Sequence, residues 1–159
     1  MSSGGASPHA VHALDGLAPK FREALVATLA DCNAAGLDAI AFETTRSDEL
    51  ARVYHTRGRP PSPEYPHPVT NAPDASWTWH GYGLACDIIS AKYEWSVAPE
   101  WFAKMAAIAK RHGLKWGGDW KSKDLPHIQW GKCKASPSQV ARTLHADHIA
   151  EVWTLVDAA

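Results

Sequence analysis

A chain of 159 residues, 45% of them hydrophobic, can bury a substantial core, so we expect one domain. The formal net charge of -1 provides no basic field, which argues against nucleic acid or an anionic membrane as a partner. No apolar run approaches the ~20 residues that a membrane-spanning helix needs, and residues 1–8 lack the basic and apolar regions of an export signal. We therefore expect a protein without membrane insertion and without a signal peptide.

Helices and short strands follow one another along the chain. Residues 1–13 are rich in Ser, Gly and Ala and predict a flexible leader, with a single domain over residues 14–159. Helical spacing of apolar residues, with a glycine after each run, predicts helices over residues 19–35, 48–57 and 99–112. Apolar runs bounded by turn signals predict strands over residues 37–44, 84–89 and 124–130. Ser136 predicts the cap of a further helix.

Prolines are concentrated between residues 59 and 76, where six of them make regular structure inside a sheet unfavourable. This stretch is predicted to form a long loop that leads directly into the most chemically distinctive part of the chain. A loop of this length is either the wall or lid of a binding site or a surface excursion without a role.

The distinctive stretch covers residues 78–87, whose sequence is Thr-Trp-His-Gly-Tyr-Gly-Leu-Ala-Cys-Asp. It places a histidine, two glycines and a carboxylate inside an apolar run. Because side chains alternate along a strand, Asp87 projects from the face opposite to the larger apolar side chains. The two glycines allow backbone conformations that are closed to other residues, so the chain can fold back and bring His80 toward Asp87.

A second stretch, residues 124–130, supplies a further histidine. In an extended chain His127 and Gln129 share one face, while the apolar residues beside them pack the other way. His80, Asp87 and His127 would then form a three-ligand zinc set with a fourth position open for water. With nine histidines in the chain, a metal site and ordinary half-buried histidines both remain open interpretations at this point.

Four stretches resemble the signature of the zinc peptidoglycan peptidases: residues 69–72, 78–87, 116–120 and 124–129. This family holds the D-alanyl-D-alanine carboxypeptidases of the VanY type and the L-alanyl-D-glutamate endopeptidases, including many bacteriophage endolysins. Its first motif reads Ser-x-His-x-x-Gly-x-Ala-x-Asp, which the chain matches except at Thr78, where a hydroxyl is kept. Residues 43–47 are similar to the arginine-bearing corner of the family, although the usual glutamine of the following helix is Ala51 here.

The resemblance implies an α+β domain like that of hedgehog proteins and DD-peptidases, in which a small antiparallel sheet carries the zinc ligands and helices flank it. It implies Zn2+ held by His80, Asp87 and His127. Asp124 occupies the position of the catalytic acid of the family, which would accept a proton from the attacking water and return it to the leaving amine. Arg46 resembles the arginine that stabilises the oxyanion. A turn aspartate and a surface ion pair are the alternative interpretations of these two residues.

The resemblance further implies a metallopeptidase that cleaves the stem peptide of bacterial peptidoglycan. Residues 116–120, Trp-Gly-Gly-Asp-Trp, most resemble the endopeptidase branch, which predicts an L-alanyl-D-glutamate endopeptidase acting as a phage-type endolysin. A D-alanyl-D-alanine carboxypeptidase is the alternative. Without a signal peptide, such a lysin would wait in the host cytoplasm before its release to the cell wall. We expect a monomer.

Two further interpretations belong to other classes of protein. An iron oxygenase also uses two histidines and a carboxylate, but His80, Asp87 and His127 do not have the close His-x-Asp spacing of that site, and Asp124 would have no role in it. A catalytically silent zinc-bearing module that binds cell wall or protein would keep the ligands and lose the acid or the arginine. The presence of both Asp124 and Arg46 therefore favours the enzyme.

Overall fold

The computed structural model describes residues 13–47, 51–53 and 73–159. The expected leader apart from residue 13, most of the helix expected over residues 48–57 and the proline-rich stretch up to residue 72 lie outside the described residues. The described helices are α1 (Pro19–Ala34), α3 (Pro99–Arg111), α4 (Gln139–Leu144) and α5 (Ile149–Leu155). None of these described helices is long and apolar enough to cross a membrane.

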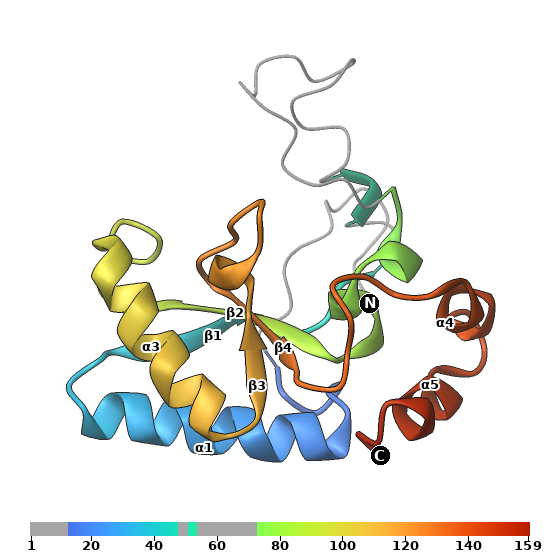
Figure 1. The fold of residues 1–159 in the computed structure, drawn as a ribbon, viewed down its shortest axis with the longest axis horizontal. Coiled ribbons are helices and arrows are strands. Elements are labelled where there is room, and N and C mark those ends of the chain that lie inside the picture. The colour runs from blue at the N-terminus through green and yellow to red at the C-terminus, as the bar shows by residue number, and fades with distance from the viewer. Residues whose placement is uncertain (1–12, 48–50, 54–72) are drawn as a thin grey trace, which may run out of the picture.

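Four strands and three short 3-10 helices complete the described elements. The strands are β1 (Ala39–Glu43), β2 (Ala85–Ser90), β3 (Leu114–Trp116) and β4 (His127–Trp130). The 3-10 helices are η1 (Ala75–Trp77), η2 (Trp79–Tyr82) and η3 (Gly117–Asp119). The strands form one antiparallel sheet in the order β1-β2-β4-β3, so β2 and β4 are central (Figure 1).

The pairing of β1 with β2 contains a bulge close to the end of β1. Ala41 pairs with Ile88, and the next pair is Glu43 with Asp87. Phe42 is therefore an extra residue on β1, and it interrupts the regular alternation of side chains. Because paired residues project to the same face, the bulge turns Glu43 to the face that carries Asp87.

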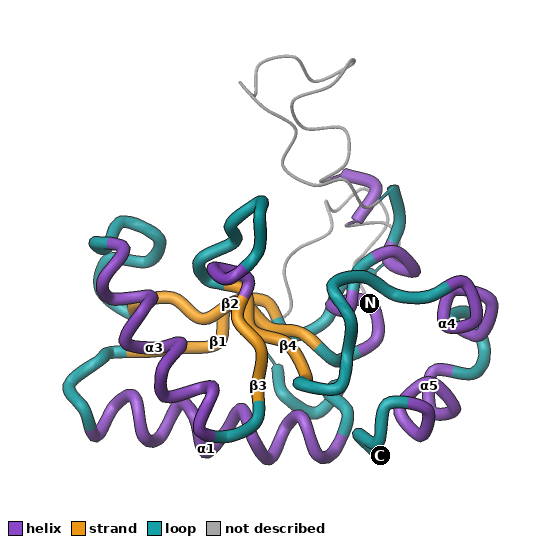
Figure 2. Tube along the Cα trace, viewed as in Figure 1, coloured by secondary structure: helices purple, strands orange, loops and turns teal. Residues whose placement is uncertain are grey.

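Helices α1 and α3 cover the apolar face of the sheet, and the loop between β3 and β4 rises on the other side (Figures 1 and 2). α1 contacts α3 and β1, and α3 contacts β3. A proline starts each of the two helices, and a glycine with positive φ follows each of them, Gly36 and Gly113. The core beneath them includes Phe21, Leu25, Cys86, Ile88, Met105 and Ile128. This arrangement confirms the expected α+β fold with a small antiparallel sheet and flanking helices.

Several element starts differ from the sequence prediction, and two of the differences have a local cause in the chain. β4 begins at His127 rather than at residue 124, because Pro126 has no N–H to donate and the chain turns there. The His127 N–H closes this turn on the Asp124 carbonyl at 3.2 Å. The cap of α4 is Ser138 and not Ser136, because the Ser138 hydroxyl accepts a backbone N–H of the first turn at 3.1 Å.

The C-terminal helices hold the segment that contains the first histidine motif. α4 and α5 contact each other, and α4 contacts η1. His145 Nε2 donates to the Gly81 carbonyl at 3.0 Å, and Trp153 Nε1 donates to the Tyr82 carbonyl at 2.6 Å. The rings of Tyr82 and His145 also meet edge to face, with their centroids 4.7 Å apart. The two helices thereby fix the backbone of η2.

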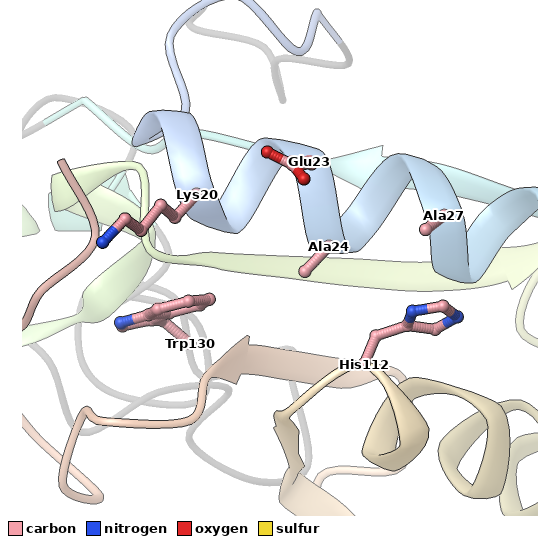
Figure 3. Close-up of a pocket in the computed structure, with 6 residues that line it drawn as sticks. All are labelled: Lys20, Glu23, Ala24, Ala27, His112 and Trp130. Atoms are coloured by element: carbon pink, nitrogen blue, oxygen red, sulfur yellow. The ribbon is translucent and has the colours of Figure 1, made fainter.

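A groove of about 400 Å³ lies between α1 and the ends of α3 and β4 (Figure 3). Its lining residues are Lys20, Glu23, Ala24, Ala27, His112 and Trp130. None of the site residues expected from the sequence belongs to this lining. The groove is therefore separate from the site described next.

Candidate metal centre

Three polar side chains from neighbouring strands form the base of the centre. Asp87 of β2 pairs with His127 of β4 on one side and with Glu43 of β1 on the other. Residues that pair across antiparallel strands project to the same face, so the three side chains form a row across the sheet. Because Cys86 and Ile88 on either side of Asp87 lie in the core, this row occupies the opposite face.

The 3-10 helix η2 brings His80 to this row. Thr78 Oγ1 accepts the His80 N–H at 3.4 Å and caps η2, and Gly83 ends it with a φ of 68°. Gly81 packs so closely on the preceding segment that a Cβ there would lie 2.1 Å from the Ala75 carbonyl oxygen. The hydroxyl and the glycines of the motif are therefore requirements of a tight turn that carries a histidine.

The ligand atoms of His80, Asp87 and His127 all lie within 4.8 Å of one another. His80 Nε2 is 3.5 Å and His127 Nδ1 is 3.9 Å from Asp87 Oδ1. Among buried side-chain atoms of the described ranges, His80 Nδ1 and Asp87 Oδ1 are the two without a hydrogen-bond partner. A buried carboxylate oxygen without a partner is unfavourable unless a cation completes its contacts. The group therefore fits a metal ion.

Burial keeps both imidazoles in the neutral form that binds metals. Burial, and to a lesser extent the Arg46 cation, lowers the pKa of His80 to about 3. Burial is also the main cause that lowers the pKa of His127. It raises the pKa of Asp87, so a metal ion at this position would favour the carboxylate by supplying the compensating charge.

Asp124 stands at the open side of the group. Its Oδ2 atom is 3.8 Å from His127 Nδ1, and its side chain is 48% exposed. Partial burial and then the negative charge of Asp87 raise the pKa of Asp124 to about 6. A half-exposed carboxyl group with such a pKa can both accept and release a proton near neutral pH.

Residues 116–120 shape the loop that presents Asp124. Trp116 Nε1 donates at 2.6 Å to the carbonyl of the residue after Asp124, and the Asp124 N–H donates to the Gly117 carbonyl at 3.0 Å. A Cβ on Gly117 would lie 2.5 Å from the Asp124 carbonyl oxygen, and a Cβ on Gly118 would lie 2.2 Å from the Trp116 ring. The glycine pair and the first tryptophan therefore place the candidate acid.

Arg46 lies next to His80 and forms an ion pair with Glu43. The Arg46 backbone N–H donates to the His80 carbonyl at 2.9 Å. Arg46 Nε donates to Glu43 Oε1 at 2.5 Å, and these side chains are only 10% and 3% exposed, so the pair is not a surface ion pair. Glu43 Oε1 is also 3.7 Å from His80 Nδ1. No sequence pattern singles out Glu43, because its place in the row depends on the bulge in β1.

We expect Glu43→Ala to lower the free energy of unfolding by about 3 kcal/mol, because it removes a carboxylate from a buried guanidinium. In the Glu43→Ala variant, a further Arg46→Ala substitution should lower the free energy of unfolding by less than Arg46→Ala does alone, since the double variant contains no unpaired buried cation. Urea denaturation of the two single variants and of the double variant, all in a chelator, measures this coupling. Additive losses would contradict the prediction.

The structure brings together all five site residues that the sequence predicted. His80, Asp87 and His127 form the candidate ligand group, Asp124 stands at its open side, and Arg46 adjoins His80. Their chemical roles stay predictions.

A family model described as D-alanyl-D-alanine carboxypeptidase matches residues 71–130. This segment contains His80, Asp87, Asp124 and His127. The peptidoglycan L-alanyl-D-glutamate endopeptidase CwlK of Bacillus subtilis (strain 168) is 31% identical to this chain over 107 residues. The alignment covers 59% of this chain and 61% of CwlK, so the chain spans less than two thirds of that relative.

Solved structures of similar fold include the Serratia marcescens L-Ala D-Glu endopeptidase ChiX, with a TM-score of 0.51, 21% identity, and coverage of 79% of this chain and 88% of ChiX. VanYB in complex with D-alanine-D-alanine has a TM-score of 0.51 and 15% identity, and the match covers 96% of this chain and 91% of VanYB. At these identities the likeness concerns the fold. The matched family model and the shared fold agree, and over residues 71–130 the chain is similar to the family of D-alanyl-D-alanine carboxypeptidases.

Proposed function

We propose that this protein is a zinc-dependent peptidase that cleaves the stem peptide of bacterial peptidoglycan, and that it acts as an L-alanyl-D-glutamate endopeptidase. The observation that carries the proposal is the convergence of His80, Asp87 and His127, with Asp124 3.8 Å from one imidazole. The choice of bond is supported by CwlK, the relative at 31% identity, which is named for that activity.

The donor set of two neutral imidazoles and one carboxylate suits zinc and leaves a coordination position open. His80 would contribute Nε2 and His127 would contribute Nδ1, since these are the nitrogens that face Asp87. When bound, zinc would supply Lewis acidity that lowers the pKa of a water molecule toward ~7 and polarises the peptide carbonyl.

Asp124 and Arg46 would perform the remaining steps. Asp124 would take the proton from the water as the water oxygen bonds to the carbonyl carbon, and would give it to the amine nitrogen as the C–N bond breaks. Its half-exposed position leaves it accessible to a peptide. The Arg46 guanidinium, oriented by Glu43, would stabilise the negative charge that develops on the carbonyl oxygen.

A D-alanyl-D-alanine carboxypeptidase is the second candidate, because the matching family model carries that description. The two reactions differ in what must fit around the cut. An endopeptidase accepts peptide on both sides of the bond, whereas a carboxypeptidase needs a closed end with a cation for the terminal carboxylate.

Digestion of purified sacculi tests the proposal through its products. An endopeptidase of this specificity should release stem peptides that begin with D-Glu and leave L-Ala on the muramic acid, as measured by mass spectrometry of the muropeptides. A chelator and the Asp124→Asn variant serve as matched controls. Free D-Ala as the sole product would replace the proposal with the carboxypeptidase, and no product at all would favour the silent binding module.

For the biological setting, we propose a phage-type lysin held in the host cytoplasm, supported by the resemblance of its motifs to endolysin members of the family. Production in the cytoplasm of a Gram-negative host should leave a culture intact until a pore-forming agent opens the inner membrane. Turbidity should then fall, but not with Asp124→Asn. Lysis before the agent is added would contradict this setting.

A further inference from the structure

Gln129 is a buried amide that contacts one of the candidate ligands. Its side chain is fully buried, and its Oε1 atom is 2.8 Å from His127 Nε2. Its Nε2 atom donates to the Lys134 carbonyl at 2.8 Å. Both ends of the amide are therefore satisfied, which is the condition under which a buried polar side chain is tolerated.

The direction of these hydrogen bonds follows from the chemistry of the Lys134 carbonyl. A carbonyl oxygen only accepts, so the group of Gln129 that faces it must be the NH2. The amide oxygen must then face His127, whose Nε2 must carry the proton that it donates. A neutral imidazole protonated at Nε2 has its lone pair on Nδ1. Nδ1 is the nitrogen that faces Asp87 and Asp124.

The same carbonyl oxygen reaches the other histidine motif. Trp79 Nε1 donates to the Lys134 carbonyl at 2.7 Å, and Trp79 is the residue before His80. One acceptor with two lone pairs therefore connects the turn after β4 to both histidine-bearing segments. Within this network, Gln129 is the residue that links the Lys134 carbonyl to the candidate ligand His127.

We propose that Gln129 is a positioning residue of the metal centre, which selects the Nε2–H tautomer of His127 and so presents Nδ1 to the metal. The inference rests on the proposed zinc centre. Outer hydrogen bonds of this kind orient an imidazole ligand and increase its basicity, and their loss weakens metal affinity roughly 10–100-fold.

The first test is Gln129→Met, which keeps the length of the side chain and removes both hydrogen bonds. Its zinc dissociation constant, measured by competition with a chromogenic chelator, should rise roughly 10–100-fold. NMR nitrogen shifts of the metal-free protein should show the Nε2–H tautomer of His127 in the unsubstituted protein and a mixture of tautomers in the variant.

Two further variants separate positioning from a general structural role. Gln129→Glu keeps an acceptor for the His127 N–H and loses the donor to the Lys134 carbonyl, so it should preserve the tautomer and the zinc affinity while it lowers thermal stability. Trp130→Phe is the matched control, because it removes the 2.7 Å hydrogen bond from Trp130 Nε1 to the Val156 carbonyl on the same strand. It should lower thermal stability and leave zinc affinity unchanged.

The inference is overturned if folded Gln129→Met retains both the single tautomer and the zinc affinity. It is also overturned if folded Gln129→Glu does not keep the Nε2–H tautomer of His127. This second variant tests the inference even if Gln129→Met does not fold. Failure of the unsubstituted protein to bind zinc would instead overturn the proposed metal centre. The tautomer in the metal-free protein would still test Gln129 in that case.

Discussion

Replacing His127 with alanine is expected to remove zinc binding and, with it, all peptidase activity. Two ligands from η2 and β2 would remain, which is fewer than the three that catalytic zinc sites use. Because the ligands come from separate segments, zinc should stabilise the unsubstituted protein, by about 4 kcal/mol when its free concentration is a thousand times the dissociation constant. The variant should lose this stabilisation.

Metal analysis after dialysis and thermal unfolding with and without zinc measure both effects. His148→Ala is a suitable control, because the His148 side chain is 56% exposed. It should behave like the unsubstituted protein in both measurements. Full zinc content in His127→Ala would reject the assignment of His127 as a ligand.

Asp124→Asn is expected to lower kcat by a factor of about 100 or more while the protein keeps its zinc and its fold, because the amide cannot accept the proton of the attacking water. KM should change little, since the lost interaction belongs to the transition state. Steady-state kinetics on a synthetic stem peptide, together with metal analysis, provide the test. Turnover close to that of the unsubstituted protein would reduce Asp124 to a turn residue.

The same variant has an expected effect on the metal-free protein. The pKa of Asp124 rises from 3.8 to about 6 on folding, so the folded state holds this proton more tightly than the unfolded state does. Ionisation of the carboxyl group therefore lowers stability as the pH rises from the ordinary pKa through the folded pKa. Asp124→Asn removes this loss, and in a chelator at neutral pH the variant should be at least as stable as the unsubstituted protein. The difference should vanish in acid.

Short-range motifs made most of the site predictable from the sequence. His80 and Asp87 belong to one stretch of ten residues, in which the capping hydroxyl and the glycines follow from the tight turn. The position of His127 beside Asp87 requires strand pairing, which the sequence alone does not define. For His127, alternation predicts only the face of the strand, and the resemblance to a family implies its place beside Asp87.

The parts that escaped prediction depend on contacts between distant segments. Glu43 shares a face with Asp87 only because β1 contains a bulge. In a strand of five residues the sequence has no reliable signal for a bulge. Alternation along the strand predicts that Gln129 shares a face with His127, but the hydrogen bond from Gln129 to the Lys134 carbonyl depends on the turn after β4. The strand starts at His127 because local turn bonds outweigh the extended pattern at residue 124.

The row formed by Glu43, Asp87 and His127 makes the chemistry of the protein depend on strand register. A slip of β4 by one residue against β2 would turn His127 to the opposite face and bring an apolar neighbour into its place. The ligands could bind an ion together only in the native strand pairing, and not in a pairing whose register has slipped. The free energy of metal binding would then also discriminate against misaligned sheets, so the same ligands would serve catalysis and the fidelity of folding.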